Sequence, residues 1–321
     1  MAKSQSIESA LAKLTTLRAA PTSPEARAEL TKALDGKSNL LAERAAKIVG
    51  EFKLADLVPH LARAFDRFMG SAGDKGCVAK AAIANALYEI GAETPEVFLA
   101  GVRHVQREAA WGGSVDVAAE LRGVCALGLV RIANREAMLH ITDLLTDTEP
   151  QARIMAARAL AYAGRDEGAL LLRLKLRLGD KESEVTCECL TALMKLSPQK
   201  QIPFVADFLN DADEGIRESA ALALGESRRR EAFEALREHV EHHKSPEHRR
   251  PLLLAIAVTR LPEAMAFLLS QVAQADIGTG LYTLEALRIY RHDETLRASI
   301  HDTIEKRGDS TLRNQFKALF S

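Results

Sequence analysis

Aromatic residues and net charge are both scarce in this chain. Aromatics make up 5% of its 321 residues, with a single tryptophan, and 43 basic against 44 acidic residues leave a net charge of −1. Proteins that hold single-stranded nucleic acid stack its bases on several aromatic side chains, and attraction to phosphate or anionic lipid needs a basic surface. The composition therefore argues against a nucleic-acid partner, unless a local patch supplies the charge that the whole chain lacks.

Long apolar runs and a cysteine framework are also missing. No stretch of about 18 consecutive apolar residues occurs, and the N-terminal segment has no apolar run of signal-peptide length. Four cysteines are too few for a disulfide framework in a chain this long, and Cys187 and Cys189 are too close together for a zinc knuckle. We therefore expect a cytoplasmic protein with reduced thiols, no membrane contact, no cofactor and no metal.

What the sequence does contain is a regular series of aspartates. The successive spacings are 39, 42, 31, 33 and 31 residues, which is the period range of stacked helical hairpins. Each aspartate stands five residues before an apolar residue that opens a stretch of helical periodicity. The series consists of Asp35, Asp74, Asp116, Asp147, Asp180 and Asp211.

The residues between the aspartates predict two helices per repeat. Apolar residues follow most of the aspartates at nine, ten, thirteen and sixteen positions, as Ile83, Ala84, Leu87 and Ile90 follow Asp74, and this spacing forms one face of a helix. Cys125 and Cys189 occupy a slot that holds alanine in other repeats, so we expect both to be buried. The second helices are predicted at 135–145, 168–178, 199–209 and 231–243. Residues 172–178 alternate like a strand, but their place in the repeat favours helix.

These residues resemble the HEAT-repeat family, in the short form also found in phycobilisome lyases. The resemblance is carried by Asp211-x4-Ile216-Arg217-x2-Ala220-Ala221-x2-Leu224-Gly225 and by the matching residues from Asp147 to Gly164, and it extends more weakly from Asp35 to Tyr290. It implies an all-α, right-handed α-α superhelix, a single solenoid over residues 1–321. The longer repeats would span about 35–115, the regular ones about 116–290 and a C-terminal cap about 291–321. It also implies that Asp147, Asp180 and Asp211 cap helices and contact basic residues such as Arg153 and Arg217.

Three classes of enzyme built on such repeats need residues that this sequence lacks or does not single out. A di-iron hydroxylase resembling deoxyhypusine hydroxylase uses repeated His-Glu dipeptides, and none of the nine histidines here is followed by glutamate. A DNA glycosylase needs aromatic clamps around the damaged base as well as a basic groove, for which one tryptophan is too little. A bilin lyase would need an open apolar cleft that the sequence does not distinguish from an ordinary groove. We therefore predict no catalytic residues.

The two longest repeats point to a binding edge. Their extra residues fall at 67–73 and 108–114, each just before an aspartate of the series, so we expect both to protrude from the same edge of the array. Phe68, Met69 and Trp111 would then be exposed for a partner. The alternative is that the extra residues lengthen second helices and that Trp111 packs inward.

A second candidate surface is basic. It would combine Arg228, Arg229, Arg230, His239, His242, His243, Arg249 and Arg250, and it would gain charge as the histidines become protonated near a pKa of about 6.5. An acidic partner would fit it, but an ordinary solvated helix surface explains the same residues. The three histidines lie three and four apart, yet no cysteine or regularly spaced carboxylate completes a metal site.

Taken together, the sequence favours a non-enzymatic scaffold or adaptor that binds a protein. The binding surfaces would be the curved inner face, which we expect the second helices to build, and the edge from Phe68 to Trp111. A helical-repeat enzyme or nucleic-acid-binding module that uses the same groove is the alternative. The partner's identity is not encoded in these patterns, because a repeat fold is a shape and not an activity.

Overall fold

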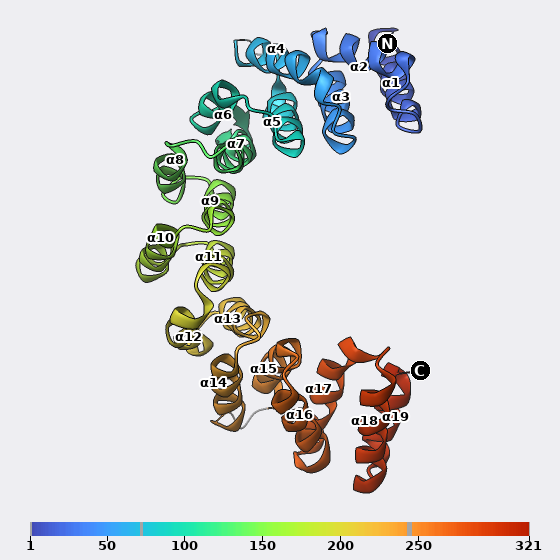
Figure 1. Cartoon of the computed structure of the whole chain (residues 1–321), viewed down its shortest axis with the longest axis vertical. Coiled ribbons are helices and arrows are strands. Elements are labelled where there is room, and N and C mark those ends of the chain that lie inside the picture. The colour runs from blue at the N-terminus through green and yellow to red at the C-terminus, as the bar shows by residue number, and fades with distance from the viewer. Residues whose placement is uncertain (1, 71–72, 243–245, 321) are drawn as a thin grey trace. The chain divides into compact units, whose positions relative to one another are not determined.

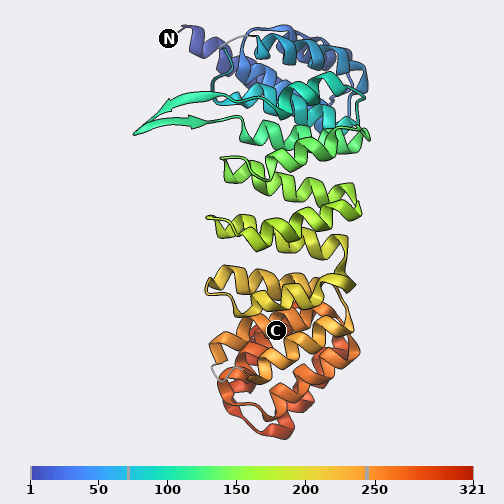
Figure 2. The same cartoon turned by 90° about the vertical axis from the view of Figure 1, so that its left-hand side faces the viewer.

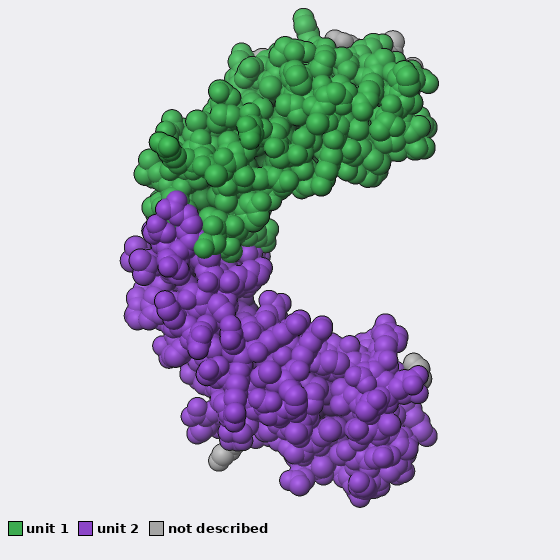
Figure 3. All heavy atoms as spheres, in the orientation of Figure 1, with its two compact units in different colours: residues 1–164 green, residues 165–321 purple. Residues whose placement is uncertain are grey.

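The structure, a computed structural model, describes residues 2–70, 73–242 and 246–320, and these are mostly helical (Figure 1). The chain separates into two compact units, residues 1–164 and residues 165–321 (Figure 3). The predicted all-α class is confirmed. The departure from it in the described ranges is one small two-stranded sheet in the first unit.

The first unit is built from helical hairpins that stack in two layers. Helices α3, α5, α7 and α9 pack one against the next in one layer, while α4 contacts α2 and α6 in the other. Its elements are α1 (Ala2–Leu17), α2 (Pro24–Asp35), α3 (Asn39–Glu51), η1 (Ala55–Leu57), α4 (Val58–Met69), η2 (Lys75–Cys77), α5 (Val78–Ile90), α6 (Pro95–Val102), β1 (Arg107–Ala110), β2 (Gly113–Asp116), α7 (Ala119–Arg131), α8 (Ala137–Leu144) and α9 (Pro150–Ala163).

The second unit repeats this arrangement. Helices α11, α13, α15, α17 and α19 pack in succession in one layer, and the other layer contains the contacts of α12 with α14 and of α16 with α18. Its elements are α10 (Asp166–Leu178), α11 (Ser183–Leu196), α12 (Pro198–Ala206), η3 (Asp207–Asn210), α13 (Glu214–Glu226), α14 (Arg230–His242), α15 (Pro246–Thr259), α16 (Pro262–Gln274), α17 (Ile277–Leu287), η4 (Arg288–Tyr290), α18 (Glu294–Arg307) and α19 (Ser310–Phe320).

The prediction that the second helices build the inner face is wrong. Within each unit, the first helix of each hairpin lies on the inside of the curve (Figure 1). The reason is close packing between first helices: a Cβ placed on Gly50 of α3 would lie 2.9 Å from Ala86 Cα of α5, and one on Gly225 of α13 would lie 2.3 Å from Ala255 O of α15. Small residues let these helices approach closely, so their layer is the shorter one and becomes concave.

Most aspartates of the series close the loop between two repeats. The carboxylates of Asp147, Asp180 and Asp211 each accept the backbone N–H two residues later, at 2.9, 3.0 and 2.9 Å respectively. They therefore shape the turn that leads into the next helix, and the N-cap position itself is a later residue, such as Asp213 of α13. Asp35 differs from the rest, because it ends α2 and its carboxylate contacts His60.

The predicted contacts to Arg153 and Arg217 exist, but they involve main-chain oxygens. Arg153 donates to the carbonyl oxygen of Asp147 at 2.8 Å, and Arg217 donates to that of Asp211 at 2.8 Å. Charge-assisted bonds of this kind tie the first turn of a helix to the loop that precedes it. Aspartate and arginine together fix the loops before α9 and α13, which is a structural role.

Removing a carboxylate from these loops should cost stability. We expect Asp180→Ala and Asp211→Ala each to lower the free energy of unfolding by about 0.5–2 kcal/mol, because the backbone N–H of the N-cap residue, Glu182 or Asp213, loses its acceptor. Urea denaturation monitored by circular dichroism measures the loss, with Asp207→Ala at an exposed position as the control. Variants as stable as the parent would contradict this structural role.

Cys125 and Cys189 are both completely buried, as predicted. Burial raises the pKa of both thiols, that of Cys189 to about 12, so neither is a thiolate near neutral pH. We expect a bulky thiol reagent to modify both residues only as fast as the chain unfolds, and Cys189→Ala to cost on the order of 1 kcal/mol. Labelling of either thiol in the native protein as fast as that of a free thiol would contradict the assignment.

Candidate functional site

The most exposed large side chain in the described ranges stands at the tip of a β-hairpin. Strands β1 and β2 pair antiparallel, with Ala109 opposite Ser114 and Ala110 opposite Gly113, and the turn between them contains Trp111 and Gly112. Gly112 has a φ of 88°, a backbone conformation that residues other than glycine rarely adopt. Figure 2 shows the hairpin projecting well beyond the helices of its unit. The relative exposure of Trp111 is 106%, so its ring has no contact with the rest of the chain.

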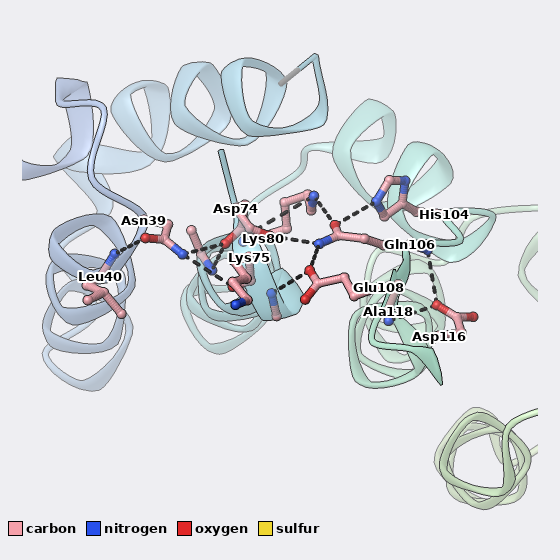
Figure 4. Close-up of polar contacts among 12 residues, drawn as sticks. Asn39, Leu40, Asp74, Lys75, Lys80, His104, Gln106, Glu108, Asp116 and Ala118 are labelled. Carbon is pink, nitrogen blue, oxygen red and sulfur yellow. Dashed lines mark hydrogen bonds and ion pairs between the residues drawn. The ribbon is translucent and has the colours of Figure 1, made fainter. Parts of the chain in front are cut away.

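The base of the hairpin is held by a polar network (Figure 4). The side-chain amide of Gln106 donates to the carbonyl oxygen of Asp74 and to the carboxylate of Glu108, both at 2.7 Å. The same Glu108 oxygen accepts the N–H of Gly76 at 2.7 Å. These bonds connect the first strand to the loop before α5. The backbone N–H of Gly76, and then the Gln106 amide, keep the pKa of Glu108 below its usual range, so this carboxylate is ionised near neutral pH.

Behind this network lies a buried ion pair. Lys80 is 2% exposed, and its ammonium group donates to Gln106 at 2.5 Å and lies 3.8 Å from the carboxylate of Asp74. Asp74 in turn accepts the N–H groups of Ala79 and Lys80, both at 3.0 Å, and thereby caps α5. The cluster thus joins the hairpin to a helix start.

Chemistry at this cluster is not supported by its surroundings. The cavity next to it, about 150 Å³, is lined by Cys77 and by residues of α3, α5 and α7, and it does not include Lys80. Burial raises the pKa of Cys77 to about 12, so that residue remains a thiol. Burial, and next the charge of Lys80, lower the pKa of His104, which favours the neutral ring. The arrangement positions the hairpin against the loop before α5.

The second strand is anchored by Arg122 of α7. Its guanidinium donates to Asp116 at 2.7 Å, to the carbonyl oxygen of His104 at 2.9 Å and to both oxygens of Asp147 at 2.8 and 2.9 Å. Although burial favours the protonated form of Asp116, the N–H groups of Ala118 and Gln106 and the Arg122 charge hold its pKa below the usual value. The hairpin base is therefore rigid at both strands, while its tip is free.

Phe68 does not belong to this exposed edge, so that part of the prediction is wrong. It is 2% exposed in the core between helices, and Met69, the last residue of α4, is half-buried. The extra residues 67–69 simply continue α4, because the apolar spacing of that helix points Phe68 inward together with Leu61 and Phe65. Of the predicted residues 67–73, positions 71 and 72 lie outside the described residues. The second insertion, which carries Trp111, projects.

The predicted basic patch is not one surface. Arg228, Arg229 and Arg230 lie at the start of α14, whereas His239 and His242 lie near its end, about 18 Å away along a helix of this length. His243 lies outside the described residues. The two histidine rings bond to helix carbonyls of Ala235 and Glu238, and among the described residues no three potential ligands form a metal site.

The two remaining arginines of that patch, Arg249 and Arg250, lie on α15 and not on α14. Arg249 contacts Asp276 and Thr279 at the start of α17, where Asp276 is the helix cap. Arg250 pairs with Glu285 at 3.1 Å on the inner layer. The sequence could not show this, because the two residues are consecutive and only the packing of α15 sends them to different neighbours.

The inner layer of the second unit contains a cavity of about 470 Å³. Its walls come from α13, α15, α17, η4 and α19, and its charges are balanced by two arginines and two glutamates. The Arg250 guanidinium lies 5.5 Å from the centre of the Tyr282 ring. Balanced charge gives this groove no attraction for a polyanion. The lining residues are Glu218, Leu222, Arg250, Pro251, Leu254, Tyr282, Glu285, Ala286, Arg288 and Leu319.

Sequence comparison identifies the architecture. A model of HEAT repeats matches residues 138–225, 170–257 and 202–288. This chain contains HEAT repeats from residue 138 to residue 288. The matched HEAT repeats run from α8 to η4 and include all lining residues of the inner-layer cavity except Leu319, whereas the hairpin precedes them.

Several solved structures are similar to this chain. The complex of CpcE and CpcF of phycocyanin lyase from Nostoc sp. PCC7120 is 16% identical, with 90% of this chain and 93% of that chain covered and a TM-score of 0.38. An engineered protein is 17% identical, with coverages of 91% and 87% and a TM-score of 0.37. Human deoxyhypusine hydroxylase in complex with glycerol is 19% identical, with coverages of 87% and 89% and a TM-score of 0.29. No curated protein matches the sequence.

Two further observations bear on the site of this HEAT-repeat protein. Among the described residues, no helix is long and apolar enough to span a membrane. Sequence reasoning also missed Gln106 and Glu108, which anchor the hairpin. The available signal was the stretch from Arg107 to Asp116, in which Trp-Gly separates two short segments as a two-residue hairpin turn does.

Proposed function

We propose that this HEAT-repeat protein is a non-enzymatic scaffold that binds a protein partner through the hairpin of β1 and β2. The observation that supports it is a fully exposed Trp111 at the tip of a hairpin whose base is fixed by buried polar contacts. An isolated two-stranded hairpin is marginally stable in water, so the base contacts are what hold this one in place. A pre-organised aromatic anchor loses little conformational freedom on binding.

The chemistry of the tip favours a protein over other ligands. Trp111 is the only large side chain between Ala109 and Ser114, so it can enter a partner's apolar pocket without steric conflict from its neighbours. Tryptophan is among the residues that contribute most to protein interfaces. Small residues on both strands also leave the hairpin edges open to a partner's main chain, as in strand addition.

Fluorescence of the single tryptophan tests the proposal directly. The free protein should emit at long wavelength and be quenched readily by acrylamide, because the indole is in water. Binding of a partner at the tip should shift the emission to the blue and protect it from the quencher. A bound partner that leaves both properties unchanged would show that the interface lies elsewhere, and the inner cavity lined by Tyr282 and Arg250 would become the next candidate.

A further inference from the structure

Helix α10 carries leucines on two faces. Leu172 and Leu176 are buried against the rest of the second unit, as an amphipathic helix requires. Leu170, Leu174 and Leu178 are 71%, 56% and 75% exposed, and because they are four residues apart they lie along one side of the helix. A helix that is apolar on both sides is typical of one that is covered on both sides.

The exposed leucines are peculiar to α10 among the outer-layer helices of its unit. Four of these helices, α10, α12, α14 and α16, can be aligned by their buried residues, since Leu172 corresponds to Val205, Leu236 and Leu268. At the positions of Leu170 and Leu174 the others have polar or small residues: Pro203 and Asp207 in the segment of α12 and η3, Glu234 and Glu238 in α14, and Ala266 and Ser270 in α16. At the position of Leu178, α14 has His242 and α16 has Gln274. The fold therefore tolerates charge at these positions, and leucine is not needed there to hold the unit together.

The charges at the two ends of α10 indicate what kind of partner covers its exposed leucines. Asp166 and Glu167 lie in its first turn, where Glu167 also contacts Arg165 at 2.9 Å, and Lys175 and Arg177 lie in its last turn, where Lys175 also contacts Asp180 at 2.7 Å. Two copies of this helix packed antiparallel place each acidic end beside a basic end, whereas a parallel pair places like charges together. The antiparallel arrangement also opposes the helix dipoles favourably.

We propose that α10 is the interface with a second copy of this chain, arranged about a twofold axis. With Leu174 at the axis, Leu174 meets its own copy and Leu170 lies opposite Leu178 of the second copy. Each patch is then complementary to itself, which a twofold dimer requires. Glu167 and Arg177 of the second copy are separated by about 6 Å along the helix axis, within reach of long side chains.

The interface is small, so the dimer is weak. One helix per copy buries less surface than the roughly 1,000 Å² typical of stable complexes, and we expect a dissociation constant on the order of tens of micromolar. Sedimentation equilibrium of the full chain should show a mass that rises from one chain toward two as the concentration increases. A chain that remains monomeric at millimolar concentration overturns the proposal.

Two substitutions test whether the exposed leucines of α10 form the dimer interface. Leu174→Glu should keep the protein monomeric at all these concentrations while its circular dichroism and melting temperature match the parent, because glutamate occupies the same position in α14 as Glu238. The matched control is Ile289→Glu, at a 50% exposed apolar residue of the same unit, which should leave dimerisation unchanged. A dimer that persists in Leu174→Glu overturns the assignment.

A charge exchange tests the antiparallel direction. Glu167→Lys alone should weaken the dimer severalfold, and Glu167→Lys combined with Arg177→Glu should restore it, since the complementary charges then return in reversed order. Failure of the double variant to recover the dimer would overturn the antiparallel packing. Trp111→Ala should leave the dimer intact, so the proposal is independent of the hairpin function; a dimer abolished by that variant would contradict it.

Discussion

Replacing Trp111 with alanine is expected to weaken binding of the protein partner by at least about tenfold. A tryptophan buried in an interface pocket contributes about 2 kcal/mol or more to binding. Because the hairpin base is already fixed, ordering of the loop subtracts little from this binding free energy. Titration calorimetry of parent and variant against a partner captured by the parent measures the loss. The helical circular-dichroism signal should be unchanged, because the indole contacts nothing in the chain.

Two controls make the result specific to the hairpin tip. Tyr162→Ala removes another exposed aromatic of the first unit, on α9, and should leave the affinity within about twofold of the parent. Trp111→Phe should retain part of the affinity, because a smaller ring still fills part of the pocket. If Trp111→Ala and Tyr162→Ala weaken binding equally, the tip is not a specific anchor.

Removing Arg122 should produce the largest loss of stability. The side chain is almost fully buried and satisfies the carboxylates of Asp116 and Asp147 at once. Arg122→Ala leaves both carboxylates in place without their cation, and breaking a buried pair in this way typically costs about 3–5 kcal/mol. Urea denaturation measures the free energy of unfolding. Arg131→Ala, at the exposed end of the same helix, should cost about 1 kcal/mol or less.

The pH dependence gives a second measure of the same interaction. The pKa of Asp116 is lowered in the folded chain, so its contribution to stability is present above the unfolded pKa of about 3.9 and is lost as the pH falls through the lower folded pKa. The parent should therefore lose stability below about pH 4, and Arg122→Ala should lose less over that range. Equal acid sensitivity in the two proteins would show that the network does not hold Asp116 ionised.

Helical periodicity predicted most of the fold because it depends on local spacing. The aspartate series and the apolar stripes located the helices from α5 to α14, and the burial of Cys125 and Cys189 followed from the slots they share with alanine. Even the alternating stretch that ends at Leu178 was assigned correctly as helix, since its length and place in the repeat outweighed its pattern.

The site was harder to predict because exposure depends on distant neighbours. Phe68 and Trp111 occupy equivalent insertions in the sequence, yet one completes a helix face in the core and the other stands at the tip of a hairpin. The two strands are short, and β1 contains two alanines, Ala109 and Ala110, which have little tendency to form strands. Their pairing is secured by Gln106, Glu108 and Arg122, whose partners lie in other loops.

By itself, the sequence determined the helical repeat, its period and the buried face of most helices, because these follow from residue spacing along one chain segment. Only the tertiary structure decided which helix layer faces inward, which insertion projects, and that the arginines and histidines around α14 lie at opposite ends of that helix. Those outcomes depend on how closely helices approach and on contacts between residues far apart in sequence. A periodic pattern describes the face of a helix but not the neighbour that covers it.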